Sequence, residues 1–356
     1  MRSRRRTHGT DGLNSGVWPV PTAHLITPTE HFFTRSHAPI PLVDLHTWRL
    51  EIGGLVERPT RFSLAELTRE FPTQEVTATI ACAGIRREEF LSLGPLPGEL
   101  PWGPEPISTG RWSGVFLAAV LDAVGTLSRA RHVEFLGLDQ VVRDAETFGF
   151  GGSVDMMKAL QGDVLLATGM NGAPLAPQHG YPLRALVPGW IGARSVKWLG
   201  RINLLEEPSA NYFQAKAYRS QRKIATDDPG DVSQGAALTL VPVNSVIVEP
   251  VQQAILESGL QRVRGWAMGS NGGPLRSVEV SADGGNSWSR AAITSTGEKW
   301  TWSFWEAEVT LPRGYHVLAA RATDTRGTTQ PATLHETWNV KGYNNNAWHR
   351  VPVTVQ

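Results

Sequence analysis

The chain has a single cysteine, Cys82, among its 356 residues and almost no net charge. One cysteine excludes an internal disulfide and a zinc site built from several thiolates. No run approaches the roughly 18 consecutive apolar residues that a membrane-spanning helix requires. With 34 basic and 33 acidic residues, the net charge of +1 is too small for strong long-range attraction to nucleic acid or anionic lipid. Any anion site on this chain must therefore be local.

The amino terminus carries Arg2 and the run from Arg4 to Arg6, but it lacks the apolar stretch that follows the charged head of an export signal. Four arginines without interleaved aromatic residues make a small electrostatic footprint, so we expect a disordered basic terminus rather than a nucleic-acid-binding arm. Because no export signal is readable, we expect a cytoplasmic protein, with the periplasm as the alternative compartment.

The chain is longer than one hydrophobic core usually organises, so its length favours two domains. In the first, prolines between residues 11 and 60 forbid long helices and favour extended segments. Ser63 and Glu66 have the spacing of a capping box, which predicts a short helix. Further helices are expected at 114–124 and 153–160, and strands at 48–52, 77–81 and 132–136. Because strand and helix do not alternate regularly, we predict an α+β domain.

Residues 227–235 combine turn formers and acidic side chains with little apolar content, which is typical of a linker. Beyond them, short alternating segments are separated by turns such as 283–286, a pattern that indicates strands. We therefore predict an all-β immunoglobulin-like sandwich at the carboxyl end. The predicted divisions are an N-terminal extension (1–29), the α+β domain (30–235) and the sandwich (236–356).

Cys82 stands at the expected end of a strand and is followed closely by Arg86 and Arg87. Neighbouring arginines favour the thiolate form and would hold an anion beside it. A thiolate is also a soft ligand for a transition metal, whose other ligands would then come from elsewhere, for instance a sulfur-bearing cofactor. A lone cysteine is more often an inert buried residue. The residues themselves leave both interpretations open.

The segment 179–199 contains several glycines that permit close approach of the backbone to a ligand. His179, Arg184, Ser195 and Lys197 add hydrogen-bond donors suited to a phosphate. The glycine spacing is neither that of a Walker loop nor that of a dinucleotide fingerprint. A surface loop with basic residues by chance is the alternative interpretation.

Nearer the amino terminus, Arg35 and His37 are two residues apart and would share one face of an extended segment. Taken alone, this pair would indicate no more than a solvated strand edge.

Together, these three segments resemble the sulfite oxidase family of molybdenum enzymes. The run from Cys82 to Arg87 is similar to a Cys-Ala-Gly-Asn-Arg-Arg motif whose cysteine binds molybdenum, while a pterin dithiolene supplies the remaining sulfur ligands. The run from Phe32 to His37 is similar to the family's Phe-Phe-x-Arg-Asn-His segment, which touches the pterin and, through the arginine, the substrate. Residues 278–288 resemble a signature of the family's dimerisation domain.

The resemblance implies that residues 30–235 form a molybdopterin-binding catalytic domain and residues 236–356 a dimerisation domain. It also implies a molybdenum-molybdopterin cofactor whose metal is bound by Cys82. It implies catalytic roles for Cys82, Arg35 and Arg87, with the two arginines holding the anion. The cofactor-binding residues that it implies are Arg35, Ser36, His37, Cys82, Asp139, His179, Arg184, Ser195, Val196 and Lys197.

The reaction implied by the resemblance is oxidation of sulfite to sulfate by oxygen-atom transfer. No haem-binding segment of the animal type precedes the motifs, so we expect no haem in this chain and a separate electron acceptor, for which a small cytochrome is the candidate. A homodimer is implied as well. We expect no nucleic-acid partner and no membrane span.

Three positions depart from the family pattern. Ile85 replaces the asparagine of the motif, Phe150 replaces a tyrosine that faces the substrate, and Gly273 stands where the family places an arginine that helps bind the oxyanion, unless Arg276 reaches the site. These changes leave the cofactor residues in place but bear on the substrate. One alternative is a reductase of an S-oxide or other oxyanion on the same cofactor. The others are a catalytically silent cofactor-binding module and a binding protein with an inert cysteine.

Overall fold

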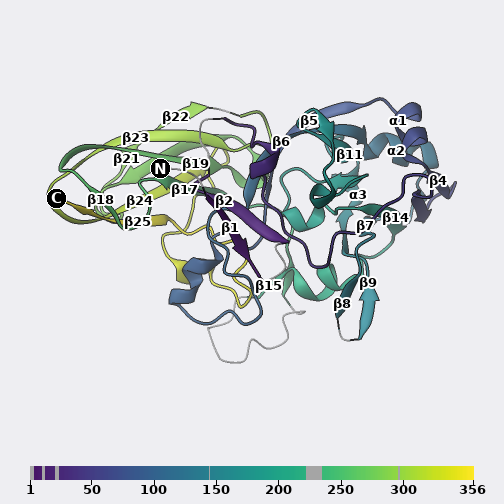
Figure 1. Ribbon diagram of the computed structural model, residues 1–356, viewed down its shortest axis with the longest axis horizontal. Helices are drawn as coiled ribbons and strands as arrows, with labels where there is room; N and C mark the ends of the chain where they lie inside the picture. Colours follow the sequence, from purple (N-terminus) through teal and green to yellow (C-terminus); the bar gives the residue numbers. More distant parts are fainter. Residues whose placement is uncertain (1–3, 10–12, 21–23, 144, 222–234, 296) are drawn as a thin grey trace.

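The computed structural model describes residues 4–9, 13–20, 24–143, 145–221, 235–295 and 297–356. Two lobes lie end to end along the long axis of the molecule (Figure 1). The first lobe combines short helices with two sheets, and the second consists of two packed sheets. The predicted α+β domain followed by an all-β sandwich is therefore confirmed.

Two sheets with a hydrophobic core between them build the first lobe. Their strand orders are β10-β7-β14-β3-β4 and β12-β11-β6-β5, with β13 paired to β11. Leu50, Val133 and Leu166, from three different strands, are fully buried in this core. The strands are β3 (Leu50–Gly54), β4 (Thr60–Phe62), β5 (Gln74–Ala81), β6 (Ile107–Phe116), β7 (His132–Gly137), β10 (Gly151–Asp155), β11 (Leu165–Met170), β12 (Ala173–Pro174), β13 (Arg184–Leu186) and β14 (Leu199–Leu205).

The predicted capping box is present at the start of α1 (Leu64–Glu70). The Ser63 hydroxyl accepts a hydrogen bond from the Glu66 amide at 3.2 Å, and the Glu66 carboxylate accepts one from the Ser63 amide at 2.8 Å. These two bonds satisfy amide groups that the first turn of a helix leaves without backbone partners.

The other two predicted helices are shorter than expected because strand pairing takes their first residues. α2 is Leu117–Val124, since Gly114 still pairs with Ala167 across β6 and β11. α3 is only Met156–Ala159 and is capped by Asp155. The predicted start of this helix at residue 153 was wrong, because Ser153 pairs with Glu134 in the ladder between β10 and β7.

The second lobe is a sandwich of the sheets β17-β19-β23-β22 and β18-β25-β24-β20-β21. Val263 from one sheet and Val280 and Leu318 from the other meet in its core. This core is separate from that of the first lobe. The elements are β17 (Asn244–Glu249), β18 (Ala254–Leu256), β19 (Gly259–Met268), β20 (Leu275–Ser281), β21 (Ser289–Arg290), β22 (Ala292–Ser295), β23 (Ser303–Leu311), β24 (Gly314–Asp324), α4 (Leu334–Thr337) and β25 (His349–Val355).

Several small elements connect these sheets. Among them, β8 and β9 form a hairpin at the edge of the first lobe (Figure 1). They are β8 (Val141–Arg143), β9 (Glu146–Phe148), β15 (Arg219–Ser220), β16 (Ala236–Ala237), a π-helical turn (Phe213–Ala217) and 3₁₀ turns at Thr29–His31, Arg87–Ser92, Pro177–His179, Gly192–Arg194 and Ser270–Gly272.

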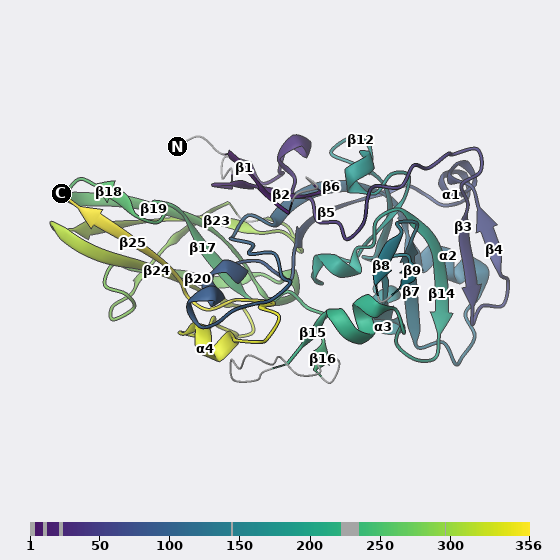
Figure 2. The same cartoon turned by 60° about the horizontal axis from the view of Figure 1, so that its bottom comes forward.

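The amino terminus forms a hairpin of β1 (Arg4–His8) and β2 (Asn14–Trp18) that lies across the junction of the two lobes (Figure 2). The expectation of a disordered basic terminus was therefore wrong for these residues. Ion pairs hold the hairpin in place, since Arg6 pairs with Glu88 at 3.1 Å and with Glu105 at 3.3 Å. Arg6, which looked like part of a solvated tail, is thus an ion-pair partner within the fold.

The predicted linker at 227–235 lies outside the described residues apart from Gly235, so the domain boundaries stay predictions. Within the described part of the chain, every helix is too short or too polar to cross a bilayer.

Candidate functional site

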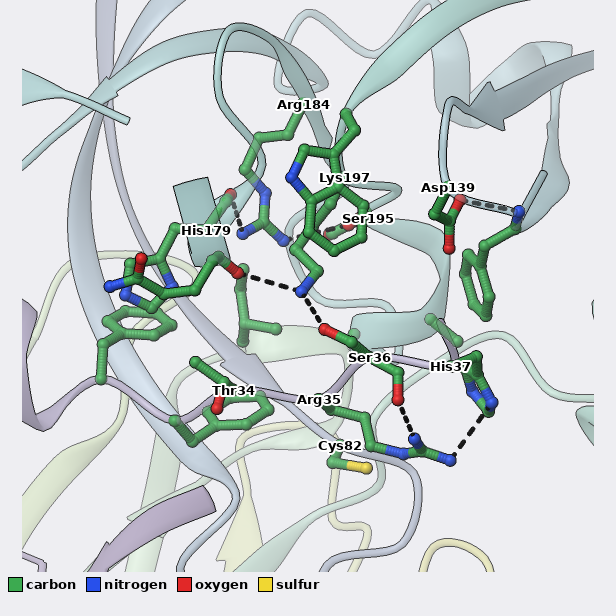
Figure 3. A pocket seen from close by; sticks show the side chains of 18 of the residues that line it. Thr34, Arg35, Ser36, His37, Cys82, Asp139, His179, Arg184, Ser195 and Lys197 are labelled. Atoms are coloured by element: carbon green, nitrogen blue, oxygen red, sulfur yellow. Dashed lines mark hydrogen bonds between the residues drawn. The ribbon is translucent and has the colours of Figure 1, made fainter. Parts of the chain in front are cut away.

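One cavity brings together segments that are far apart in the sequence (Figure 3). It is bounded by the carboxyl end of β5 and by the loops 32–37 and 178–198. The predicted site residues that line it are Arg35, Ser36, His37, Cys82, Asp139, His179, Arg184, Ser195 and Lys197. The structure thus gathers most of the predicted site at one place.

One end of the cavity is cationic. The Lys197 ammonium donates to the Ser36 hydroxyl at 2.7 Å and to the Gln178 carbonyl at 3.0 Å. The Arg184 guanidinium donates to the carbonyls of His179 and Ser195, each at 3.0 Å. Its Nε–H is buried and has no protein partner among the described residues. A buried donor of this kind is costly unless a ligand accepts from it.

Burial disfavours positive charge at this end. It lowers the pKa of His179 from 6.5 to about 3 and that of Arg184 from 12.5 to about 9. Burial, together with the neighbouring Arg184, also lowers the pKa of Lys197 well below its usual value. None of these side chains forms a salt bridge to a carboxylate among the described residues. The donor set therefore lacks an anionic partner of its own and fits a phosphate.

Asp139 stands at the side of the cavity, where one carboxylate oxygen accepts a hydrogen bond from the Phe150 amide at 2.9 Å. Burial raises the pKa of this carboxyl, against the opposing effects of that hydrogen bond and of Lys197. The hydrogen bond to the backbone fixes the carboxylate at the cavity wall, where it can accept from a ligand N–H.

Cys82 forms the opposite end. It follows the last residue of β5, and its amide donates to the Pro106 carbonyl at 2.9 Å. Its sulfur accepts a long hydrogen bond from the Gly84 amide at 3.4 Å. The next residue, Ala83, also lines the cavity and is small, so the sulfur can be approached from the cavity.

Arg35 lies beside Cys82 in the cavity (Figure 3). Its guanidinium donates to the Asn14 side-chain oxygen at 3.0 Å, to the Ser36 carbonyl, and to His37 Nδ1 at 3.3 Å. All of these acceptors are neutral. The positive charge of Arg35 is thus held in place without being cancelled.

Arg87 and Val196 do not line the cavity. Arg87 forms a buried salt bridge to Glu99 at 3.2 Å and donates to the Lys341 carbonyl at 2.9 Å. Gly84 makes room for it, because a Cβ there would lie 2.8 Å from the Arg87 guanidinium. Val196 is part of the hydrophobic core of the first lobe.

Tyr218 is a cavity residue that the sequence motifs missed. Its hydroxyl lies 3.0 Å from His37 Nε2. Because an arginine can only donate, the contact of Arg35 makes His37 Nδ1 an acceptor, and the neutral ring therefore donates from Nε2 to Tyr218. Burial lowers the pKa of His37 well below 6.5, consistent with this neutral form, and it raises the pKa of Tyr218 to about 12. The phenol keeps its own hydrogen for another acceptor.

The three positions that depart from the family pattern have different surroundings. Phe150 lines the cavity and stacks on His37, with ring centroids 5.1 Å apart. The missing hydroxyl at this position does not leave the cavity without a phenol, since Tyr218 supplies one. Ile85 is buried in the core at the lobe junction, and neither Gly273 nor Arg276 lines the cavity.

Comparison with known protein families matches both lobes. Residues 37–213 match the oxidoreductase molybdopterin binding domain, and residues 236–356 match the Mo-co oxidoreductase dimerisation domain.

Individual relatives cover most of the chain. Sulfite oxidase from Gallus gallus is 38% identical over 335 residues, which are 91% of this chain and 72% of that protein. Nitrate reductase [NADH] 2 from Phaseolus vulgaris is 36% identical over 353 residues, which are 93% of this chain and 39% of that protein. The chain spans 62% of the length of the mammalian mitochondrial sulfite oxidases that it matches.

Among solved structures, the sulfane dehydrogenase SoxCD from Paracoccus pantotrophus superposes with a TM-score of 0.81 at 25% identity. The match covers 99% of this chain and 88% of the compared chain. The arrangement of the two lobes is thus shared with a solved protein over nearly the whole length.

Proposed function

Because this chain belongs to the sulfite oxidase family of molybdopterin oxidoreductases, we propose that it oxidises sulfite to sulfate and passes the electrons to a separate acceptor. The observation that carries the proposal is the cavity itself. A sulfur ligand for a soft metal stands at one end, and at the other stand Arg184 and Lys197, which pair with no carboxylate in the part of the chain that the structure describes.

The residues of the cavity fit a molybdenum-pterin cofactor. His179, Arg184 and Lys197 would hold its phosphate, and the unpartnered Nε–H of Arg184 would gain an acceptor. Asp139 would accept from the pterin ring, and the Cys82 thiolate would bind the metal. When bound, the group supplies the oxygen-atom transfer and takes up two electrons.

The protein's own task at the metal end is to bind and orient an anion. Arg35 offers an uncancelled positive charge, worth roughly 2–5 kcal/mol for a desolvated contact to an oxyanion. The Tyr218 hydroxyl, whose oxygen already accepts from His37, is free to donate to the same anion. Phe150 and Ala193 give the cavity an apolar wall, which excludes water and strengthens these polar contacts.

The second candidate is reduction of an oxyanion on the same cofactor. It is favoured by the similarity to a nitrate reductase and by the hydrophobic Phe150 in the wall. The two reactions need the same cofactor residues and differ in the direction of electron flow. A catalytically silent cofactor-binding module is the third candidate, and it requires only that the cofactor residues be present.

The match of residues 236–356 to a dimerisation domain supports a homodimer. We propose a separate small cytochrome as the electron acceptor, since a haem iron takes up electrons one at a time.

The test is elemental analysis of the purified protein followed by steady-state assays. We expect molybdenum at close to one atom per chain and turnover of sulfite with an artificial one-electron acceptor. The second candidate would be established if the molybdenum-containing protein turned over nitrate or an S-oxide with an electron donor but did not turn over sulfite. Molybdenum without any turnover would favour the silent module, and a purified chain without molybdenum would contradict the cofactor assignment.

A further inference from the structure

The amino-terminal hairpin lies outside both matched domains, since the first of them begins at residue 37. It is nevertheless in contact with the cavity wall. Ser15 of β2 and Thr34 form an isolated bridge, with backbone hydrogen bonds of 3.0 and 2.7 Å in the two directions. The strand β2 thus runs alongside the segment that carries Arg35.

Asn14, the first residue of β2, is the point of closest connection to the site. Its side-chain oxygen accepts hydrogen bonds from Arg35 Nη1 and from the Ser36 amide, both at 3.0 Å. The residue is only 5% exposed. Both lone pairs of one oxygen are therefore used to fix a single short stretch of the cavity wall.

The same hairpin is anchored to the chain around Cys82. Arg6 pairs with Glu88 and Glu105, and His8 Nε2 lies 2.7 Å from the Glu105 carboxylate. Glu105 is almost fully buried, and Gly16 packs directly on it, since a Cβ at Gly16 would lie 2.8 Å from Glu105 Cγ. The hairpin therefore joins the Arg35 side of the cavity to the Cys82 side.

The acceptor that an arginine meets decides how much of its positive charge a bound anion would experience. Around Cys82 the neighbouring arginines face carboxylates, with Arg86 on Glu89 at 2.7 Å and Arg87 on Glu99 at 3.2 Å. Arg35 instead faces an amide oxygen. An amide orients a guanidinium through its dipole but leaves the net charge at +1, whereas a carboxylate in the same place would cancel the charge.

We propose that Asn14 is a positioning residue that holds Arg35 beside Cys82 with its charge available to an oxyanion, which makes the amino-terminal hairpin a working part of the site. The inference rests on the proposed function for the identity of the anion. The geometric part, fixation of residues 35 and 36 by one amide oxygen, does not depend on turnover.

The test compares Asn14→Ala and Asn14→Asp with the parent, all as cofactor-loaded full chains. Asn203→Ala serves as the matched control, because Asn203 donates to Glu134 on β7, away from the cavity. Three quantities are measured: hydrogen exchange of the Ser36 amide, the dissociation constant of sulfate by calorimetry, and KM and kcat for sulfite.

For Asn14→Ala we expect faster exchange at Ser36 and an increase in KM and in the sulfate dissociation constant of about tenfold, with a smaller change in kcat. Asn14→Asp keeps both acceptor lone pairs, so exchange at Ser36 should stay slow. Its carboxylate would cancel the Arg35 charge, so the anion should bind more weakly still. The control should match the parent in all three measurements.

The proposal is overturned if the Ser36 amide of Asn14→Ala exchanges as slowly as in the parent, or if both variants bind sulfate within about twofold of the parent. The proposed function fails in a different way. A parent that binds sulfate tightly, with the expected order of variants, but turns over no sulfite would retain the role of Asn14 and reject sulfite oxidation.

Discussion

The two ends of the cavity collect positive charge in different ways. At the proposed phosphate end, Arg184 and Lys197 donate to carbonyl and hydroxyl oxygens and pair with no carboxylate among the described residues. At the proposed metal end, the two arginines closest to Cys82 in sequence are paired with glutamates, whereas Arg35 meets neutral acceptors. Adjacency to the proposed metal ligand in a motif therefore does not predict which charge an anion will meet. The neighbouring acceptors decide that.

The largest expected effect concerns the metal end. Cys82→Ser replaces a soft thiolate by a hydroxyl that is a poor ligand for molybdenum at neutral pH. We expect turnover to fall by more than about 100-fold, beyond the effect typical of losing an outer-shell partner of a metal ligand. Since serine is slightly smaller than cysteine, the fold should persist, which circular dichroism and thermal melting will check. The phosphate end should still retain the pterin, as fluorescence of the released cofactor can report.

Unchanged turnover in Cys82→Ser would contradict the proposed role of Cys82, because the reaction would then proceed without its thiolate. If Cys82→Ser does not fold, Cys82→Ala takes its place in the test, because it removes the sulfur without adding a polar group.

Substitution of the two predicted anion-binding arginines separates charge from structure. Arg35→Gln removes an uncancelled charge, so sulfite affinity should fall by roughly 2–5 kcal/mol while the melting temperature changes little. Arg87→Gln breaks a buried ion pair, and we expect it to lower the free energy of unfolding by about 3 kcal/mol, the low end for such pairs. The reason for the low end is Lys341, which stays 3.2 Å from Glu99 and offsets its charge.

Steady-state kinetics and chemical denaturation of both variants provide the measurement. If Arg87→Gln instead raised KM as strongly as Arg35→Gln at unchanged stability, Arg87 would be contributing to the anion site in spite of Glu99, and the contrast between the arginines would be wrong.

Much of this organisation follows from the sequence. The capping box at Ser63, the sandwich and the clustering of three separate motifs in one cavity can be predicted, because each depends on local spacing or on a recognisable pattern. The pairing of Arg87 with Glu99 and the contribution of Tyr218 could not. Both arise from tertiary contacts between residues that no short motif links, and Tyr218 stands near the carboxyl end of the first lobe.

The amino terminus is a second place where the sequence alone does not predict the contacts of charged residues. Its arginines look like a solvated tail when only composition is considered. One of them, Arg6, pairs with Glu88 and Glu105, which lie far along the chain and are brought near only by the fold. Sequence patterning can predict that charge is present but not whether it is paired.

The pH dependence of stability should distinguish the cationic end from the sandwich. Burial lowers the pKa of His179 and that of His349 to about 3. Between about pH 3 and 6.5 the unfolded chain therefore binds more protons than the folded one, so stability falls as the pH is lowered through this range. Each histidine contributes up to about 1.4 kcal/mol per pH unit.

Cofactor should change the contribution of His179 alone, because a phosphate beside this ring favours its protonated form and raises its pKa. Denaturation of the apo and loaded proteins at several pH values should give a shallower slope in the loaded protein. His179→Phe should remove that difference, and His349, which accepts from the Ile247 amide at 3.1 Å, should contribute equally in both forms. An identical slope with and without cofactor would place the phosphate elsewhere.

The smallest expected effect concerns the hydroxyl of Tyr218. Tyr218→Phe keeps the ring that stacks on Tyr343 with centroids 5.3 Å apart, and it removes only the hydroxyl. If that hydroxyl donates to the anion, sulfite affinity should fall by about 0.5–1.5 kcal/mol, or up to about tenfold. Tyr218→Phe also removes the acceptor of the His37 Nε2–H. The double variant with Arg35→Gln therefore tests whether Arg35, His37 and Tyr218 act together. Since Arg35 sets the tautomer that orients the phenol, the two losses should be less than additive, whereas strict additivity in a double-mutant cycle would mean that Arg35 and Tyr218 act on the anion independently.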